Sequence, residues 1–278
     1  NLRGIPVDAE FRMRPEALRK AIEIGLQSGH LPFAIVACGG ATNTGAIDPL
    51  DAVADVASEF DVWLHVDGAF GAWAALDPAY AERFKGISRA DSVTLNPHKW
   101  LQVPVDCGAL LTRHPDVHRA AFSLTPDYLV AGRSEVPWPG EHMFDLTYGN
   151  RALKVWAAIA RLGRAEVAEL VTRCNTLATL LERRVRDAPD LELLSAASLS
   201  VVNFRYRPDG RALDDAALVG IDRIERLDGN DLVERIATVI GQLDSGIGWQ
   251  FLYIGTENDL HRRPRHRLAP EPRRAGPG

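Results

Sequence analysis

A short apolar strand that ends in a proline and a lysine is the feature of this sequence that most restricts its fold. Val93–Leu95 is a β-branched and apolar run, and Pro97 prevents the strand from continuing. His98 and Lys99 are therefore predicted to lie on the turn after the strand, at the edge where open α/β sheets bind ligands. Lys99 is one of only four lysines and has apolar neighbours. A desolvated lysine is available as a nucleophile.

A second strand upstream ends in a carboxylate. Val62–Val66 is mainly apolar, and Asp67 follows it, with small residues next. The chain between Asp67 and Lys99 is long enough for one crossover. Two neighbouring parallel strands would therefore bring a carboxylate and an amine to the same edge of the sheet. An acid that holds a pyridinium nitrogen and a lysine that forms a Schiff base are the pair that pyridoxal phosphate (PLP) needs.

Strands and helices alternate through the first 111 residues, which predicts an α/β fold with a mainly parallel sheet. The continuous apolar run Phe33–Ala37 predicts a strand covered on both faces. Asp48 is predicted to cap the helix that follows it. The other expected elements are a helix from Pro15 to about Gly29 and a strand at Cys107–Leu111.

Several motifs, in this order, resemble one known enzyme family. They are Thr42–Leu50, His65–Asp67, Asp91–Ser92, Asn96–Trp100 and Asp106–Cys107. Together they resemble the group II PLP-dependent amino acid decarboxylases, of the aromatic-amino-acid and glutamate decarboxylase type. The similarity runs without gaps from about Val7 to Leu111 and more loosely to about Gly163. It implies the PLP-dependent transferase fold of type I.

The resemblance implies catalytic roles for three residues. Lys99 would form the Schiff base with PLP, and Asp67 would pair with the pyridine nitrogen. His98, beside the lysine, would face the phosphate or the substrate. A lysine and an acid of this kind are seldom tolerated in a protein interior without a partner or a function.

The resemblance also implies further contacts with the cofactor. Thr42 and Asn96 fall on cofactor-contacting positions, and Ala69 would lie against the ring. Taken alone, Thr42 and Asn96 are equally well explained as ordinary turn formers, and Asp67 as a strand-end cap. The case for a cofactor site therefore depends on Lys99 and Asp67 together.

Three functions remain open at this stage. The first is decarboxylation of an L-amino acid, with an aromatic one expected first, to the amine and carbon dioxide. In the resembled family a loop tyrosine returns the proton; the nearest candidates here are Tyr128 and Tyr148, and neither matches its position. A second possibility is therefore aldehyde-forming oxidative deamination on the same cofactor. The third is a truncated, non-catalytic subunit, because the resembled enzymes carry a long portion before the lysine that supplies the main phosphate-binding loop.

We expect three segments. Residues 1–163 would form the C-terminal part of the PLP-binding large domain, and residues 164–257 a small α+β domain. This domain would begin with an amphipathic helix from Arg164 to Asp187 and include a helical pattern through Leu232–Leu243 and a last strand at Gly248–Ile254. The buried side of the first helix is predicted to consist of Val167, Leu170, Val171, Cys174, Leu177, Ala178, Leu181 and Val185. Residues 258–278 are rich in arginine and proline, which predicts a disordered tail. The full-length protein is expected to be a homodimer that acts on a small amino acid substrate.

Composition excludes several other classes of protein. The chain is 46% hydrophobic and 25% charged, as in ordinary globular domains. It has no apolar run of membrane-spanning length and does not open with a basic-then-apolar signal. Its three widely separated cysteines suit the reducing cytosol, so a cytoplasmic protein without membrane contact is expected. The net charge is −5, and residues 261–278 hold six arginines against one glutamate, so the rest of the chain carries −10. An acidic body of this kind argues against nucleic-acid binding. Three cysteines without a C-x-x-C pair argue against disulfides and against a metal site.

Overall fold

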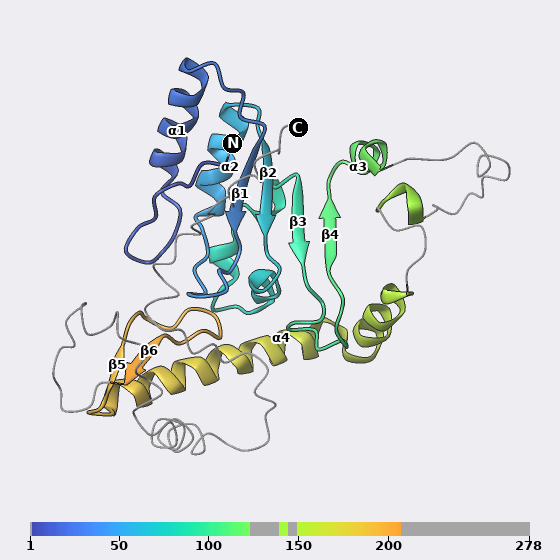
Figure 1. Ribbon diagram of the computed structural model, residues 1–278. Helices are drawn as coiled ribbons and strands as arrows, with labels where there is room; N and C mark the ends of the chain where they lie inside the picture. The colour runs from blue at the N-terminus through green and yellow to red at the C-terminus, as the bar shows by residue number, and fades with distance from the viewer. Residues whose placement is uncertain (1, 123–138, 144–148, 207–278) are drawn as a thin grey trace, which may run out of the picture.

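The computed structural model describes residues 2–122, 139–143 and 149–206, and a four-stranded sheet lies at its centre (Figure 1). The strand order is β1 (Ala34–Cys38), β2 (Trp63–Asp67), β3 (Ser92–Leu95) and β4 (Ala109–Thr112). The first three strands run parallel, and β4 pairs antiparallel with β3. The predicted α/β class with a mainly parallel sheet is therefore confirmed.

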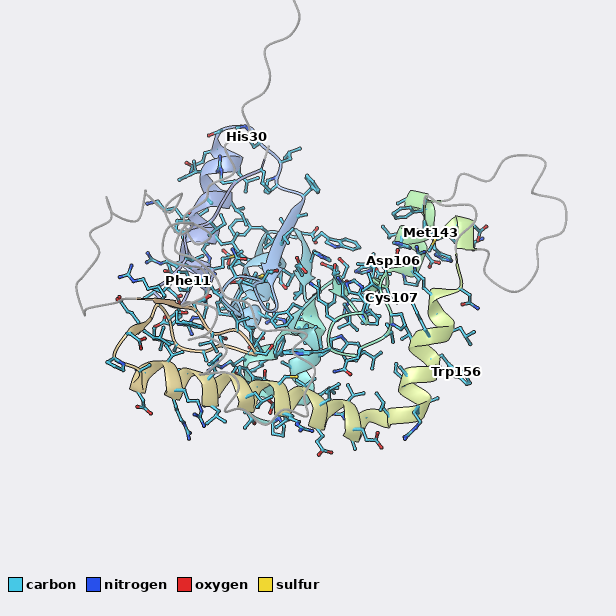
Figure 2. All side chains as sticks on the ribbon, turned by 60° about the horizontal axis from the view of Figure 1, so that its bottom comes forward. Phe11, His30, Asp106, Cys107, Met143 and Trp156 are labelled. Carbon is cyan, nitrogen blue, oxygen red and sulfur yellow. The ribbon has the colours of Figure 1, made fainter. Side chains whose placement is uncertain are left out.

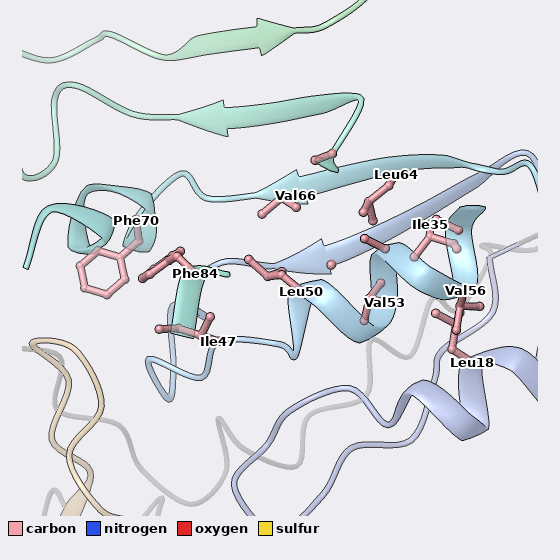
Figure 3. Close-up of a cluster of buried hydrophobic side chains, with 14 of the residues drawn as sticks. Leu18, Ile35, Ile47, Leu50, Val53, Val56, Leu64, Val66, Phe70 and Phe84 are labelled. Carbon is pink, nitrogen blue, oxygen red and sulfur yellow. The ribbon is translucent and has the colours of Figure 1, made fainter. Parts of the chain in front are cut away.

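Helix α2 (Leu50–Glu59) packs against β1 and β2 on one face of this sheet, and α1 (Pro15–Gln27) packs against α2. Figure 3 shows Leu64 and Val66 of β2 on the same side as Leu50 and Val53 of α2. All four side chains are at most 1% exposed. Burial of an aliphatic side chain contributes about 1.5–3 kcal/mol, so this cluster holds the sheet and α2 together.

The other face of β1 is open in the described part of the chain. Side chains of β1 alternate between exposed and buried, and Val36 is 58% exposed. The prediction that this strand is covered on both faces is wrong here, because no described element packs over Val36. A run of apolar residues shows only that a strand can be covered on both faces.

Short 3-10 helices replace a long crossover helix between β2 and β3. They are η1 (Gly71–Leu76), η2 (Ala81–Phe84) and η3 (Ile87–Arg89). Phe84 is 3% exposed and packs into the main cluster. The crossover therefore contributes to the same core as α2.

A 37-residue helix, α4 (Arg151–Asp187), runs past the lower edge of the sheet in Figure 1. Gly163 interrupts it with φ 66° and ψ 178°, and the helix changes direction there. Of the eight side chains predicted to be buried on this helix, Val167, Val171, Ala178, Leu181 and Val185 are buried, and Leu170, Cys174 and Leu177 are partly buried. The buried Asn175 amide donates to the Asp77 carboxylate at 2.7 Å, which fixes α4 to the segment after η1.

The remaining described elements are small. Helix α3 (Pro115–Phe122) follows β4, and η5 (Pro139–Glu141) precedes α4. Strands β5 (Leu191–Leu193) and β6 (Phe204–Tyr206) pair antiparallel beside the end of α4. The helix and strand predicted after Tyr206, and the tail, lie outside the described residues. No helix in the described ranges is long and apolar enough to cross a bilayer.

Buried Asp48 joins two distant segments instead of capping α2. Its Oδ1 accepts from the Met13 amide at 2.6 Å, and its Oδ2 accepts from the Cys38 amide at 2.7 Å. The cap position of α2 is Pro49, and no side chain caps this end. The predicted capping role is therefore wrong. Burial raises the pKa of Asp48, although both hydrogen bonds act in the opposite direction.

Replacing Asp48 with alanine should lower the free energy of unfolding by about 3 kcal/mol. Two partly buried amides would lose the acceptor that they have among the described residues, and each unsatisfied buried group costs about 1–3 kcal/mol. Urea denaturation followed by circular dichroism measures this loss. Asp55→Ala is the control, because among the described residues its exposed carboxylate makes a surface ion pair with Arg89, which is worth at most about 1 kcal/mol. Equal losses in the two variants would contradict the tethering role of Asp48.

Candidate active site

The chain segments that leave β1, β2 and β3 meet at one edge of the sheet. The Gly39 amide donates to the Asp67 carbonyl at 2.8 Å, which joins the ends of β1 and β2. The Asn96 amide donates to the Ala69 carbonyl at 3.2 Å, which joins the segments after β2 and β3. Figure 1 shows these strand ends on the side of the sheet nearest α4. Three successive strands therefore supply the edge that the sequence predicts as a ligand site.

Asp67 is exposed at the end of β2. Its Oδ1 accepts from the Ala69 amide at 3.1 Å, which is an ordinary strand-end interaction. Its Oδ2 accepts no hydrogen bond from any described residue. This second oxygen is available to a donor on a ligand, such as a protonated ring nitrogen.

Lys99 is half-buried on the turn after β3, where its amide donates to the Asn96 carbonyl at 3.0 Å. Its ammonium makes no ion pair or hydrogen bond within the described ranges. By contrast, the ammonium of Lys85 pairs with Asp51 at 3.3 Å, and that of Lys154 donates to a loop carbonyl at 2.6 Å. A half-buried amine without such a partner is a candidate nucleophile toward an aldehyde.

A ring contact fixes the acid-bearing segment against the lysine-bearing one. Phe70 follows the end of β2, Trp100 follows Lys99, and their ring centroids are 4.7 Å apart. Phe70 is 7% exposed and Trp100 is fully buried. Aromatic pairs of this kind contribute about 0.5–1.5 kcal/mol beyond their buried area. The contact limits the movement of Lys99 relative to Asp67.

His98 holds the loop that leads to β4. Its Nδ1 lies 2.9 Å from the Cys107 amide nitrogen and 2.6 Å from the Cys107 carbonyl oxygen. The described residues provide no partner for Nε2. The structure therefore gives His98 a backbone-anchoring contact, and its predicted role toward phosphate or substrate stays a prediction.

Asn96 and Thr42 lie on the loops at this edge. The Asn96 Oδ1 is 3.3 Å from the position that a Cβ on Gly108 would take, so a larger side chain there would crowd the amide. Thr42 is exposed on the loop after β1, which is closed by the Ala41 amide donating to the Ala46 carbonyl at 2.8 Å. No described contact joins Thr42 to Asp67 or Lys99.

With this arrangement established, comparison with known proteins identifies the family. Residues 1–207 match the pyridoxal-dependent decarboxylase conserved domain. The chain belongs to the pyridoxal-dependent decarboxylase family. Its sequence is 37% identical over 214 residues to an aromatic-L-amino-acid decarboxylase of Bacillus atrophaeus. That alignment covers 76% of this chain and 45% of the relative, so the chain spans less than half of the relative's length.

Two solved structures share the fold of this chain. The crystal structure of Oryza sativa TDC with PLP and tryptamine matches with a TM-score of 0.73 and 29% identity, over 83% of this chain and 49% of that one. The crystal structure of Rhodiola rosea 4-hydroxyphenylacetaldehyde synthase matches with a TM-score of 0.70 and 27% identity, over 83% and 48%. The resemblance inferred from the motifs is confirmed.

The polar groups at the sheet edge fit the PLP cofactor of the decarboxylase family. PLP presents a ring nitrogen and an aldehyde. The free Oδ2 of Asp67 can accept a hydrogen bond from the first, and the unpaired amine of Lys99 can bond to the second. Ala69 is small and next to Asn96, which leaves room for a flat ring. No cluster of metal-ligating side chains occurs in the described ranges.

Two cationic side chains of α4 bind the loop between Lys99 and β4, and the sequence alone did not identify this contact. Arg151 pairs with Asp106 at 2.8 Å, and Lys154 donates to the carbonyls of Pro104 and Asp106 at 2.6 and 3.0 Å. Figure 2 shows Asp106 and Cys107 beside the first part of α4. The Arg151 hydrogen bond lowers the pKa of Asp106. The R-x-x-K spacing places both cations on one helical face, and this was the signal available in the sequence.

Cys38 lies opposite Asp67 in the pairing of β1 with β2. Burial raises the pKa of its thiol to about 12, and the charges of Asp48 and Asp67 add to the effect. The thiolate is the reactive form of cysteine. Cys38 is therefore expected to be inert in the folded protein, despite its position next to the site.

The rate of alkylation tests whether the Cys38 thiol is inert in the folded protein. At pH 8, Cys38 should react with iodoacetamide about 1,000-fold more slowly in the folded chain than in urea, because its thiolate fraction falls tenfold for each unit of pKa. Mass spectrometry of the Cys38 peptide at several times measures both rates. Equal rates in the folded and denatured chain would show that the thiol is not protected.

Proposed function

We propose that this chain carries the lysine- and acid-bearing part of a PLP-dependent amino acid decarboxylase. The observation that supports this most is the half-buried Lys99 amine, which has no partner among the described residues. The Phe70–Trp100 contact ties its segment to the one that follows the exposed Asp67 carboxylate. Membership of the decarboxylase family supports the reaction type. We further propose that the full-length protein is a cytoplasmic homodimer.

When bound, PLP supplies an electron sink for the bond to the substrate carboxylate. Lys99 would hold the cofactor covalently through Nζ and release it to the substrate amine. The Asp67 carboxylate would keep a proton on the ring nitrogen, because a nearby anion favours the charged form. Ala69 would lie against the ring.

The polar residues of the neighbouring loops would complete this part of the site. Asn96 and Thr42 would contact the cofactor with their amide and hydroxyl groups. His98, anchored at Cys107 through Nδ1, would direct Nε2 toward the phosphate or the substrate. We propose an aromatic L-amino acid as substrate, since an aromatic-L-amino-acid decarboxylase is 37% identical to the chain.

Aldehyde formation is the second candidate, and the similarity to Rhodiola rosea 4-hydroxyphenylacetaldehyde synthase favours it. Tyr128 and Tyr148 lie outside the described residues. Product analysis separates the two reactions. A decarboxylase releases carbon dioxide and an amine. The oxidative reaction also releases carbon dioxide, but it reduces oxygen to hydrogen peroxide and yields an aldehyde and ammonia.

The experiment is to incubate the chain and PLP with carboxyl-labelled tryptophan, tyrosine or glutamate. Released carbon dioxide, amine, aldehyde and consumed oxygen are then measured. Amine equal to carbon dioxide, without oxygen uptake, supports the proposal. Aldehyde with oxygen uptake supports the second candidate. Covalently attached PLP without either product supports a non-catalytic subunit.

A further inference from the structure

A row of hydrogen-bonded side chains crosses the sheet on the Asp67 side. Trp63 Nε1 donates to Ser92 Oγ at 2.9 Å, Ser92 Oγ lies 2.8 Å from His65 Nδ1, and His65 Nε2 lies 3.0 Å from Thr94 Oγ1. Residues of a strand alternate between faces, so Trp63, His65 and Asp67 share one face of β2. In the pairing of β2 with β3, Ser92 is opposite His65 and Thr94 is opposite Asp67.

The chemistry of these groups determines which of them donates and which accepts in each hydrogen bond of the row. The indole of Trp63 can only donate, so Ser92 Oγ accepts from it. The buried Ser92 hydroxyl then has one hydrogen to place, and His65 Nδ1 is its only acceptor in the described residues. Because buried donors are almost always satisfied, Nδ1 accepts and Nε2 carries the imidazole hydrogen. His65 therefore donates to Thr94.

Thr94 is the last residue of the row, and its hydroxyl hydrogen has no acceptor among the described residues. Thr94 Oγ1 accepts from His65, so its own hydroxyl hydrogen is available, and no described residue accepts it. Neighbouring strands are about 4.8 Å apart, which puts the Thr94 side chain beside that of Asp67. The free oxygen of Asp67 and the free hydrogen of Thr94 thus belong to register partners.

We propose that His65 is a positioning residue that acts through Thr94 on the Asp67 carboxylate. By occupying the Thr94 oxygen as a donor, His65 leaves the hydroxyl hydrogen free for the neighbouring Asp67 carboxylate, which it would orient for the ring nitrogen of PLP. In this structure the two side chains do not yet share a hydrogen bond. The inference rests on the proposed function only in this last step. The direction of the row can be tested without cofactor.

The first test is nuclear magnetic resonance of the ¹⁵N-histidine-labelled chain without PLP. A long-range ¹H–¹⁵N correlation should show His65 as the neutral tautomer with hydrogen on Nε2. Ser92→Ala removes the donor to Nδ1 and should give a mixture of tautomers, whereas Ser92→Thr keeps the hydroxyl and should restore the single form. Hydrogen on Nδ1 in the wild-type chain would overturn the proposal.

The second test is a double-mutant cycle on PLP affinity, measured by fluorescence titration. His65→Leu and Thr94→Val should each weaken PLP about fivefold, the effect of one net hydrogen bond. The double variant should also lose about fivefold, because both changes remove the same interaction. His65→Gln, whose amide can still donate to Thr94, should stay close to wild type; circular dichroism checks that each variant folds.

The outcomes separate the two ideas. An additive loss of about 25-fold in the double variant, or a His65→Gln variant as weak as His65→Leu, would overturn the positioning role while PLP binding stands. A wild-type chain that shows the Nε2 tautomer but binds no PLP would instead overturn the proposed function, and the action on Asp67 with it.

Discussion

Replacing Lys99 with alanine is expected to abolish covalent attachment of PLP to the chain. Lys99 is the half-buried lysine whose amine lacks a partner among the described residues, and without it no other amine lies on the turn after β3. The measurement is reduction of the chain–PLP mixture with borohydride, followed by digestion and mass spectrometry. The wild-type chain should carry the pyridoxyl group on Lys99, and the variant should lose the signal completely.

Two further variants make this result specific. Lys85→Ala removes a lysine that is 71% exposed and paired with Asp51, so attachment should be unchanged. Lys99→Arg keeps the positive charge but cannot form the bond, because the guanidinium stays protonated. It should therefore lose attachment as fully as Lys99→Ala. Equal pyridoxyl yields on Lys20, Lys85 and Lys99 of the wild-type chain would mean that PLP reacts with any exposed lysine and has no specific binding site.

Much of the fold could be predicted because strands and helices are encoded locally. The apolar run before Pro97 and the carboxylate after Val62–Val66 mark two strand ends, and β3 and β2 end there. The periodicity from Val167 to Val185 predicts the buried side of α4. The cap assigned to Asp48 failed because its acceptor oxygens serve Met13 and Cys38. Met13 is 35 residues away, and a local rule cannot detect such a tether.

The site could be predicted only as a set of residue types at one edge. Alternation along β2 places His65 on the same face as Asp67, which was readable from the sequence. The partners of His65 were not, because they depend on the register of β2 with β3: a shift of one residue would bring neither Ser92 nor Thr94 beside it. The Phe70–Trp100 contact likewise depends on how two loops fold after their strands end.

Replacing Asp67 with alanine is expected to lower kcat of the active protein by at least about 100-fold, while the substrate KM changes little. A preorganised charge that acts on the transition state typically accounts for about 10²–10³ in kcat, and its loss leaves contacts with the ground-state substrate intact. Asp67→Asn should be nearly as slow, because a neutral amide does not favour a proton on the ring nitrogen.

The assay requires saturating PLP, so that weaker cofactor binding is not mistaken for slower chemistry. Asp55→Asn is the matched control, since this exposed carboxylate on α2 forms its ion pair with Arg89 and lies away from the sheet edge that carries Asp67. Both kcat and KM should stay at the wild-type values. If Asp67→Ala raised KM by the same factor as it lowered kcat, the carboxylate would contribute to substrate binding as much as to the reaction. If Asp67→Asn were fully active, the charge would be irrelevant and only the shape of the side chain would matter. Either result would remove the acid from the proposed mechanism, while the lysine attachment could still stand on its own measurement.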